Sequence, residues 1–421
     1  LNINNNVIFV SFPTFATKVL NPVGIYTDRG FVFKGEKEFG MPKTDFSFLR
    51  RFQGSKCCGY DFEEEKLTPL SLDVLDWNFH SQSFEPHPIS IEALREGAEE
   101  EERKKAEQQL VRCFQRRGWA IINVGEGIDS MASEAFSATL QMQKLINPNE
   151  KRSFHTKFSS SHPARFVGWA TDSGREWVQF RHGLEKEYNL EIWPKSALHL
   201  RETFCRAYLA NDDVAQVVFR ALLRGVGLWD EKEMDGLLDE NGEVAVGEER
   251  FGGSVQRFFA YKESPVSPSK EEEKKAKARF SSSPHADMGL ITVSARSTWP
   301  ALEVYDFCGR IMQPERTLQH GEWIAFAGET MSYLTCGVIP ALIHRVPFLY
   351  RKGVEPRCSS PFFLRAHPKA LLTPLKKRVK ENEKHDEGKE RERNGILCED
   401  LMTKHARIRP WRSKYKGSGD W

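Results

Sequence analysis

The sequence has no paired cysteine motif. Its eight cysteines are scattered, none stands in a C-x-x-C spacing, and the one adjacent pair is Cys57-Cys58. Zinc-binding modules need paired ligands, and disulfide frameworks belong to short secreted chains that are dense in cysteine. Both classes are therefore disfavoured, and the pattern favours a reducing intracellular compartment, which means the cytoplasm, with the nucleus left open.

Long hydrophobic runs and an excess charge are also lacking. No apolar run reaches about eighteen residues, so no membrane-spanning helix is expected. The apolar stretch from Val7 to Phe15 has no basic segment before it, which argues against a signal peptide, although the sequence begins at Leu1 and leaves the true start open. With 61 Lys and Arg against 59 Asp and Glu, the formal charge is +2. This balance gives no general argument for binding nucleic acid or a membrane.

Two polar residues at alternate positions, His285 and Asp287, stand in the run Pro-His-Ala-Asp-Met-Gly-Leu-Ile-Thr-Val, and His344 follows 59 positions after His285. The β-branched residues indicate the start of a strand, in which positions i and i+2 point to the same face. Two histidines and one carboxylate, arranged facially with open positions, are the ligands of non-heme Fe(II) oxygenases. An isolated His-x-Asp is most often a pair of polar residues on the wet face of a strand. The metal-site prediction therefore depends on neighbouring motifs.

Such a motif comes thirteen residues after His344, in Arg357-Cys358-Ser359-Ser360-Pro361-Phe362-Phe363-Leu364. Arg357 and Ser359 share one face of the predicted strand. A guanidinium binds a carboxylate through two parallel hydrogen bonds, and a hydroxyl adds another donor. A metal triad followed by a carboxylate clamp makes one coherent site.

With these motifs, the chain resembles the 2-oxoglutarate- and Fe(II)-dependent dioxygenases of the isopenicillin N synthase-like family. The resemblance covers roughly residues 68 to 370. It is carried by the two motifs above and by four further segments, at 113–123, 299–304, 321–329 and 341–346. The fold it implies is mixed α/β with a mainly β core: a double-stranded β-helix, or jelly roll, with helices packed on one side.

The resemblance also implies a chemistry. His285, Asp287 and His344 would hold Fe(II), while Arg357 and Ser359 would bind 2-oxoglutarate. With dioxygen, and with ascorbate in a supporting role, decarboxylation of 2-oxoglutarate would drive hydroxylation, desaturation or ring closure of a small organic substrate.

The strand at 254–261 departs from the family pattern. Arg257 stands where the family has Asn, and Phe259 stands where it has a Tyr that helps bind the co-substrate. Tyr261 would replace that hydroxyl after a shift in register. We expect Arg257 to contact an anionic group of the substrate. Further candidate contacts are Arg165, Trp169 and Arg181, in the Gly- and aromatic-rich segment between residues 159 and 183.

Composition divides the chain into four regions. An N-terminal extension of irregular or short-strand structure (1–66) precedes a region of helices and strands (67–250), in which an apolar stripe from Phe204 to Leu222 predicts a core helix. The jelly-roll core (251–370) contains a mobile insertion (265–283) rich in Ser, Pro and charge. A charged, basic tail (371–421) completes the chain.

Three other functions stay open. The first is an iron-dependent oxidase of the same fold that does not use 2-oxoglutarate, and the second is a non-catalytic binding scaffold. In the third, nucleic acid or protein contacts the tail, where Trp411 and Tyr415 lie among basic residues. A solvated tail is the preferred interpretation.

Overall fold

The structure is a computed structural model that describes four short strands within residues 1–34 and most of the chain from residue 87 onward. The later described ranges are 87–157, 166–171, 175–229, 237–238, 251–261, 280–305, 311–347, 356–373, 396–398 and 400–401. The chain divides into two compact units, Leu1–Gln82 and Ser83–Trp421. The boundary that the sequence pattern indicates between residues 66 and 67 lies outside the described residues.

The N-terminal unit contains one antiparallel sheet whose four strands follow in chain order. These strands are β1 (Ile3–Asn4), β2 (Val7–Phe9), β3 (Val23–Thr27) and β4 (Gly30–Lys34). A strand that the sequence indicates at residues 70–75 lies outside the described residues.

The second unit is built on a mostly antiparallel ten-stranded sheet in the order β5-β6-β15-β12-β18-β10-β9-β8-β7, with β17 also paired to β10. Strands far apart in sequence pair directly in it, as β6 does with β15 and β10 with β18. The strand bounds are β5 (Ile89–Ser90), β6 (Trp119–Asn123), β7 (His155–Lys157), β8 (Phe166–Thr171), β9 (Arg175–Arg181), β10 (Val255–Tyr261), β12 (Ile291–Ala295), β15 (Glu322–Ala327), β17 (Cys358–Ser359) and β18 (Pro361–Leu364).

A smaller sheet of four strands has the order β11-β16-β13-β14. Its strands are β11 (Phe280–His285), β13 (Glu303–Tyr305), β14 (Ile311–Met312) and β16 (His344–Pro347). One buried apolar cluster joins the two sheets, because Trp119 and Phe326 of the large sheet pack with Val304 and Val346 of the small one. Two sheets that enclose a shared interior form a jelly roll, so the predicted fold is confirmed.

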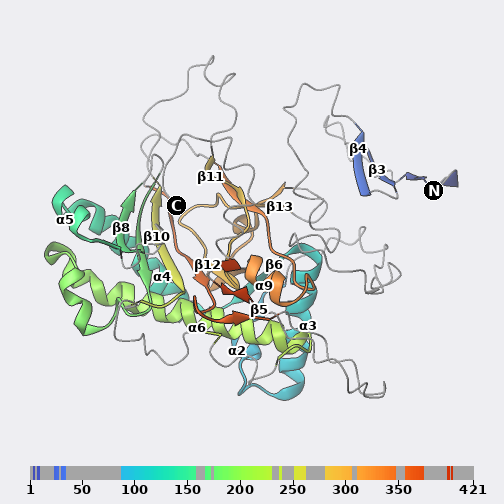
Figure 1. Ribbon diagram of the computed structural model, residues 1–421, viewed down its shortest axis with the longest axis horizontal. Coiled ribbons are helices and arrows are strands. Elements are labelled where there is room, and N and C mark those ends of the chain that lie inside the picture. The colour runs from blue at the N-terminus through green and yellow to red at the C-terminus, as the bar shows by residue number, and fades with distance from the viewer. Residues whose placement is uncertain are drawn as a thin grey trace, which may run out of the picture. The chain divides into compact units, whose positions relative to one another are not determined.

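Helices cover the other face of the large sheet (Figure 1), as expected. Helix α6 (Arg201–Gly225) buries a wide apolar stripe, and its Phe204 and Tyr208 lie against Phe258 of β10 and Phe362 of β18. This confirms the predicted core helix. The remaining helices and helical turns are α2 (Ile91–Leu94), α3 (Glu100–Arg117), α4 (Glu126–Leu145), α5 (Pro148–Ser153), η3 (Glu187–Ile192), η4 (Lys195–Leu200), η5 (Pro314–Arg316) and α9 (Glu329–Leu334). Within the described part of the chain, no helix is long and apolar enough to cross a membrane.

Two regions differ from their sequence-based description. The tail is not entirely solvated: β20 (Ile396–Leu397) pairs with β19 (Leu371–Leu372), and Cys398 and Leu401 are buried. Apolar residues within the charged run account for this packing. Most of the expected insertion lies outside the described residues, but residues 280–283 belong to β11.

Candidate metal centre

Backbone pairing brings His285 and His344 together. β11 and β16 are antiparallel, and the two histidines are directly opposite each other in the ladder. His285 is the last residue of β11, and Asp287 lies in the turn before β12. The sequence predicted that both residues begin one strand. The structure instead places His285 at the end of β11 and Asp287 in the following turn, before β12 starts at Ile291. The predicted convergence of the three residues is nevertheless confirmed.

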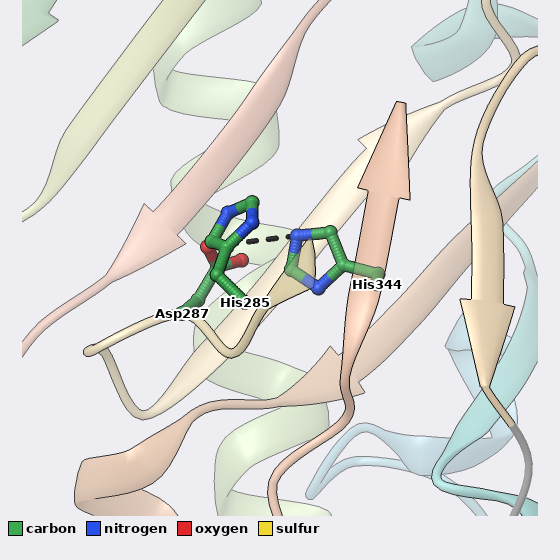
Figure 2. Close-up of side chains that lie close together, drawn as sticks. All are labelled: His285, Asp287 and His344. Atoms are coloured by element: carbon green, nitrogen blue, oxygen red, sulfur yellow. Dashed lines mark ion pairs between the residues drawn. The ribbon is translucent and has the colours of Figure 1, made fainter. Parts of the chain in front are cut away.

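The three side chains point toward one another (Figure 2). Oδ1 of Asp287 lies 3.6 Å from Nε2 of His285 and 3.7 Å from Nε2 of His344. One ligand atom from each residue lies within 4.8 Å of the other two. Bonds from nitrogen or carboxylate oxygen to a divalent ion such as zinc are about 2.0–2.2 Å long, so two ligands of one ion are at most about 4.4 Å apart. The arrangement therefore fits one metal ion with only small side-chain movements.

Hydrogen bonds behind the ligands fix their orientation. Thr292 donates from Oγ1 to Oδ2 of Asp287 at 2.6 Å, which leaves Oδ1 facing the histidines. Nδ1 of His344 lies 3.3 Å from the carbonyl of Leu342. A carbonyl only accepts, so Nδ1 is the donor in this contact, and Nε2 is the nitrogen that faces Asp287. Such outer partners orient metal ligands and strengthen their binding.

The electrostatics of the group favour a cation. Asp287 and His344 are buried, whereas 19% of the His285 side chain is exposed. Burial alone would raise the pKa of Asp287, but His344, His285 and the Thr292 hydroxyl together lower it below its usual range. The carboxylate is thus ionised, and the His285 side chain is the most exposed of the three.

A second set of polar groups lies around Arg357. Ser359 pairs with Phe259 across β17 and β10, and the backbone N–H of Tyr261 donates to the carbonyl of Arg357. Oγ of Ser359 is 3.5 Å from the Tyr261 hydroxyl, and Cζ of Arg357 is 4.7 Å from the centre of the Tyr261 ring. Tyr261, not Phe259, therefore supplies the hydroxyl beside the Arg-x-Ser motif.

Arg357 also has a buried partner that the sequence did not suggest. Its Nη2 donates to Oε1 and Oε2 of Glu315 at 3.0 and 3.1 Å, and its Nε donates to the carbonyl of Trp299 at 3.0 Å. Nη1 is buried and has no hydrogen-bond partner among the described residues. A buried donor without an acceptor costs about 1–3 kcal/mol. An acceptor such as a ligand carboxylate would satisfy this donor.

The other predicted contacts are divided between the two faces of the large sheet. Phe258 packs against α6, so its neighbours Arg257, Phe259 and Tyr261 face the interior. Nε of Arg257 donates to Oε1 of Gln179 on β9 at 2.9 Å.

The side chains of Trp169 and Arg181 contact other residues of the fold. Trp169 pairs with Val178, the neighbour of the interior-facing Gln179, and lies on the opposite face with Nζ of Lys151 4.5 Å from its ring. Nη1 of Arg181 donates to the carbonyls of Gly252 and Gly253. Arg165 lies outside the described residues. The structure therefore does not bring Trp169 to the metal ligands.

Sequence reasoning missed Thr292 and Glu315. Thr292 had a usable signal, because it lies on the strand after Asp287 among fully buried apolar residues, where a hydroxyl needs a partner. Glu315 had none, since it occupies a single helical turn, η5, that no motif marks.

No protein-family model matches the sequence, and no curated protein matches it either. Solved structures are similar in fold. A full-length Neurospora crassa protein in complex with alpha-KG (alpha-ketoglutarate, that is, 2-oxoglutarate) aligns with 75% of this chain and 94% of its own, at 17% identity and a TM-score of 0.57. A 2OG-Fe(II) oxygenase family protein from Caulobacter crescentus covers 76% and 98%, at 17% identity and 0.53.

The rice dioxygenase for auxin oxidation is a third similar structure. It covers 77% of this chain and 95% of its own, at 16% identity and a TM-score of 0.51. These alignments span nearly the whole length of each solved chain. This chain therefore has the fold of the 2-oxoglutarate- and Fe(II)-dependent oxygenases, with a His-Asp-His group between its sheets.

Proposed function

We propose that this chain is an Fe(II)- and 2-oxoglutarate-dependent oxygenase that oxidises a small organic molecule. The convergence of His285, Asp287 and His344 is the observation that carries the proposal. Two imidazoles and one carboxylate that converge on one point match the facial ligand set of such enzymes. Fe(II) bound there, with 2-oxoglutarate and dioxygen, supplies an oxidant that breaks a substrate C–H bond while the keto acid is converted to succinate and carbon dioxide.

The side chains around the site would orient the metal ligands and bind 2-oxoglutarate. Thr292 and the Leu342 carbonyl hold the ligands in place, and Phe326 packs 4.8 Å from the His344 ring and shields it from water. Nη1 of Arg357 with the hydroxyls of Ser359 and Tyr261 would hold the distal carboxylate of 2-oxoglutarate.

For the substrate, we infer an anionic group beside a flat ring. The interior face of β9 and β10 carries both cationic and aromatic side chains. Cζ of Arg257 lies 6.0 Å from the Trp177 ring and 5.6 Å from the Phe363 ring, and Cζ of Arg175 lies 4.8 Å from the Phe259 ring. A guanidinium binds an anion, and the rings stack on a planar group.

The proposed activity is tested by succinate formation from 2-oxoglutarate with Fe(II), dioxygen and ascorbate. The wild type should form succinate and His344→Ala should not. Formation that survives His344→Ala would contradict the assigned site.

The substrate proposal is tested with a panel of aromatic carboxylates and their neutral amides, together with thymine and 5-formyluracil, which are bound in other structures of the Neurospora crassa protein. Carboxylates should stimulate succinate formation more than their amides, and Arg257→Ala should remove that preference. Equal stimulation in the wild type would contradict an anionic substrate.

The alternative is an oxidase that does not use 2-oxoglutarate. One observation favours it: Glu315 already occupies Nη2 of Arg357. Oxidation of a substrate with Fe(II) and dioxygen alone, unaffected by 2-oxoglutarate, would support this alternative.

A further inference from the structure

Glu315 and Arg357 form the most deeply buried ion pair among the described residues. Their side chains are 2% and 3% exposed. Glu315 comes from η5 and Arg357 from the residue before β17, so the pair joins distant segments. Nη2 of Arg357 donates to both carboxylate oxygens, and its Nε is bound to the Trp299 carbonyl. The plane of the guanidinium is therefore fixed.

Glu315 cannot swing away from this contact. Its Oε1 accepts from Oγ of Ser297 at 2.8 Å, and its Oε2 accepts from the backbone N–H groups of Ala301 and Leu302 at 2.7 and 2.8 Å. Burial would raise the pKa of Glu315, but Arg357 and these donors lower it. The side chain is a permanent negative charge beside Arg357.

The pair leaves Arg357 with one guanidinium nitrogen for a ligand. Nη1 is buried without a hydrogen-bond partner among the described residues. Cζ of the same guanidinium lies 4.7 Å from the centre of the Tyr261 ring, and the Tyr261 hydroxyl is 3.5 Å from Oγ of Ser359. A ligand carboxylate at Nη1 is attracted by the positive charge of Arg357 but repelled by the negative charge of Glu315. The net attraction is therefore weaker than that of an unpaired arginine. Like charges on one guanidinium repel, and this repulsion is strong where water is excluded.

We propose that Glu315 is a specificity-determining residue for the keto-acid co-substrate: it neutralises Arg357, so that the clamp selects the distal carboxylate by hydrogen bonding and only weakly by charge. This inference rests on the proposed function. It predicts modest discrimination between 2-oxoglutarate and 2-oxopentanoate, which has the same keto-acid head and a methyl group at its far end.

The test measures binding, not turnover. Dissociation constants of both keto acids are determined by anaerobic calorimetry with Fe(II)-loaded protein, and their ratio is the selectivity. Glu315→Gln removes the charge at nearly unchanged size, so the selectivity for 2-oxoglutarate should rise about tenfold. Loss of packing alone would weaken both keto acids alike and leave the ratio unchanged. An unchanged or lower ratio overturns the inference.

Glu107→Gln is the matched control. Oε1 of Glu107 lies 2.6 Å from Nε of Arg224 in another largely buried ion pair, which joins α3 and α6. This variant should keep the wild-type ratio.

A wild-type measurement covers the case in which Glu315→Gln does not fold. A neutralised clamp predicts a wild-type selectivity below about a hundredfold, and a higher selectivity overturns the inference. The two proposals fail differently. A wild type that binds neither keto acid contradicts the proposed function itself, whereas binding with an unchanged ratio in Glu315→Gln contradicts only the role of Glu315.

Discussion

One buried hydroxyl group, that of Thr292, fixes the orientation of Asp287 in the candidate metal centre. Thr292 is 1% exposed, and its hydroxyl bonds the oxygen of Asp287 that does not face the histidines. Valine has the same shape without the hydroxyl. Thr292→Val should therefore weaken Fe(II) binding about 10- to 100-fold, as loss of an outer hydrogen bond does at other metal sites. Anaerobic Fe(II) titration measures the effect.

A matched variant separates this effect from loss of a buried hydroxyl in general. Thr139 in α4 is also 1% exposed and donates to the Ala135 carbonyl within its own helix. Thr139→Val should bind Fe(II) like the wild type. Equal weakening in both variants would show that the Asp287 contact has no special role.

The buried ion pair between Arg357 and Glu315 stabilises the fold. Arg357→Met would leave a buried carboxylate without its cation, and this should cost about 3–5 kcal/mol of unfolding free energy near neutral pH. Urea denaturation monitored by tryptophan fluorescence measures the loss. The double variant Arg357→Met/Glu315→Gln should recover much of it, since no buried charge remains.

The loss in Arg357→Met should depend on pH. The pKa of Glu315 in the folded wild type is lowered, so its stabilisation is present above the unfolded value of about 4.3 and is lost as pH falls through the folded pKa. Without Arg357, burial favours the protonated acid instead. The difference between wild type and variant should therefore be largest near pH 7 and shrink toward pH 4. A difference that grows on acidification would contradict the pairing.

The sequence predicted the residues with chemically distinctive spacing and missed those without it. His285, Asp287 and His344 were found because ligand type and order are constrained by the metal. Glu315 was missed because an acidic residue in a short turn is normally solvated, and only the folded chain shows that it is buried. The position of Tyr261 beside the Arg-x-Ser motif could not be predicted from the sequence alone, because it depends on the register in which β10 pairs with β17.

At the scale of elements, the turn between β15 and α9 packs directly on the loop that carries Asp287. The backbone N–H of Glu329 donates to the Asp287 carbonyl at 2.7 Å. A Cβ on Gly328 would lie 2.3 Å from the Gly289 carbonyl oxygen and 2.8 Å from that of Asp287. Gly328→Ala should therefore displace the loop, lower the unfolding free energy by about 1–3 kcal/mol and weaken Fe(II) binding.

Gly127 in α4 is the control for this element. A Cβ there meets nothing within 4 Å, so Gly127→Ala should keep Fe(II) binding and stabilise the chain by about 0.4–1 kcal/mol. Thermal unfolding and metal titration of both variants test whether the contact of Gly328 with the Asp287 loop leaves no room for a side chain. Normal metal binding by Gly328→Ala would show that the loop tolerates displacement.

Helix periodicity was readable from the sequence, whereas strand ends near the site were not. The apolar stripe of α6 follows a regular spacing over 25 residues. By contrast, β11 ends at His285 after a register shift within the ladder, and such irregularities depend on the partner strand.

At the scale of the whole molecule, the C-terminal region contributes to the folded core. Cys398 and Leu401 are 1% and 2% exposed, and β20 pairs with β19. A chain that ends at residue 373 should lose about 3 kcal/mol of unfolding free energy, because this apolar surface is removed. A chain that ends at residue 401 keeps these contacts and should be more stable than the chain that ends at residue 373. Equal stability of both truncated chains would contradict a packed C-terminal region.

The order of the motifs in the sequence predicted the jelly roll. It did not predict that residues after position 374 pack on the core. Ligands far apart in sequence implied a jelly roll that brings strands together, and the two sheets confirm it. The charged composition after residue 374 concealed the packed residues near Ile396, because two short apolar segments carry little periodic signal.

The central claim is that His285, Asp287 and His344 bind Fe(II) and that Arg357 orients 2-oxoglutarate beside it. Anaerobic titration of the metal-free protein with Fe(II) and then 2-oxoglutarate tests it most directly, since a keto acid that chelates Fe(II) gives a visible absorption band. The account predicts this band in the wild type, its absence in His344→Ala and weaker 2-oxoglutarate binding in Arg357→Ala. Iron binding without the band would contradict the use of 2-oxoglutarate, and no iron binding at all would contradict the metal centre.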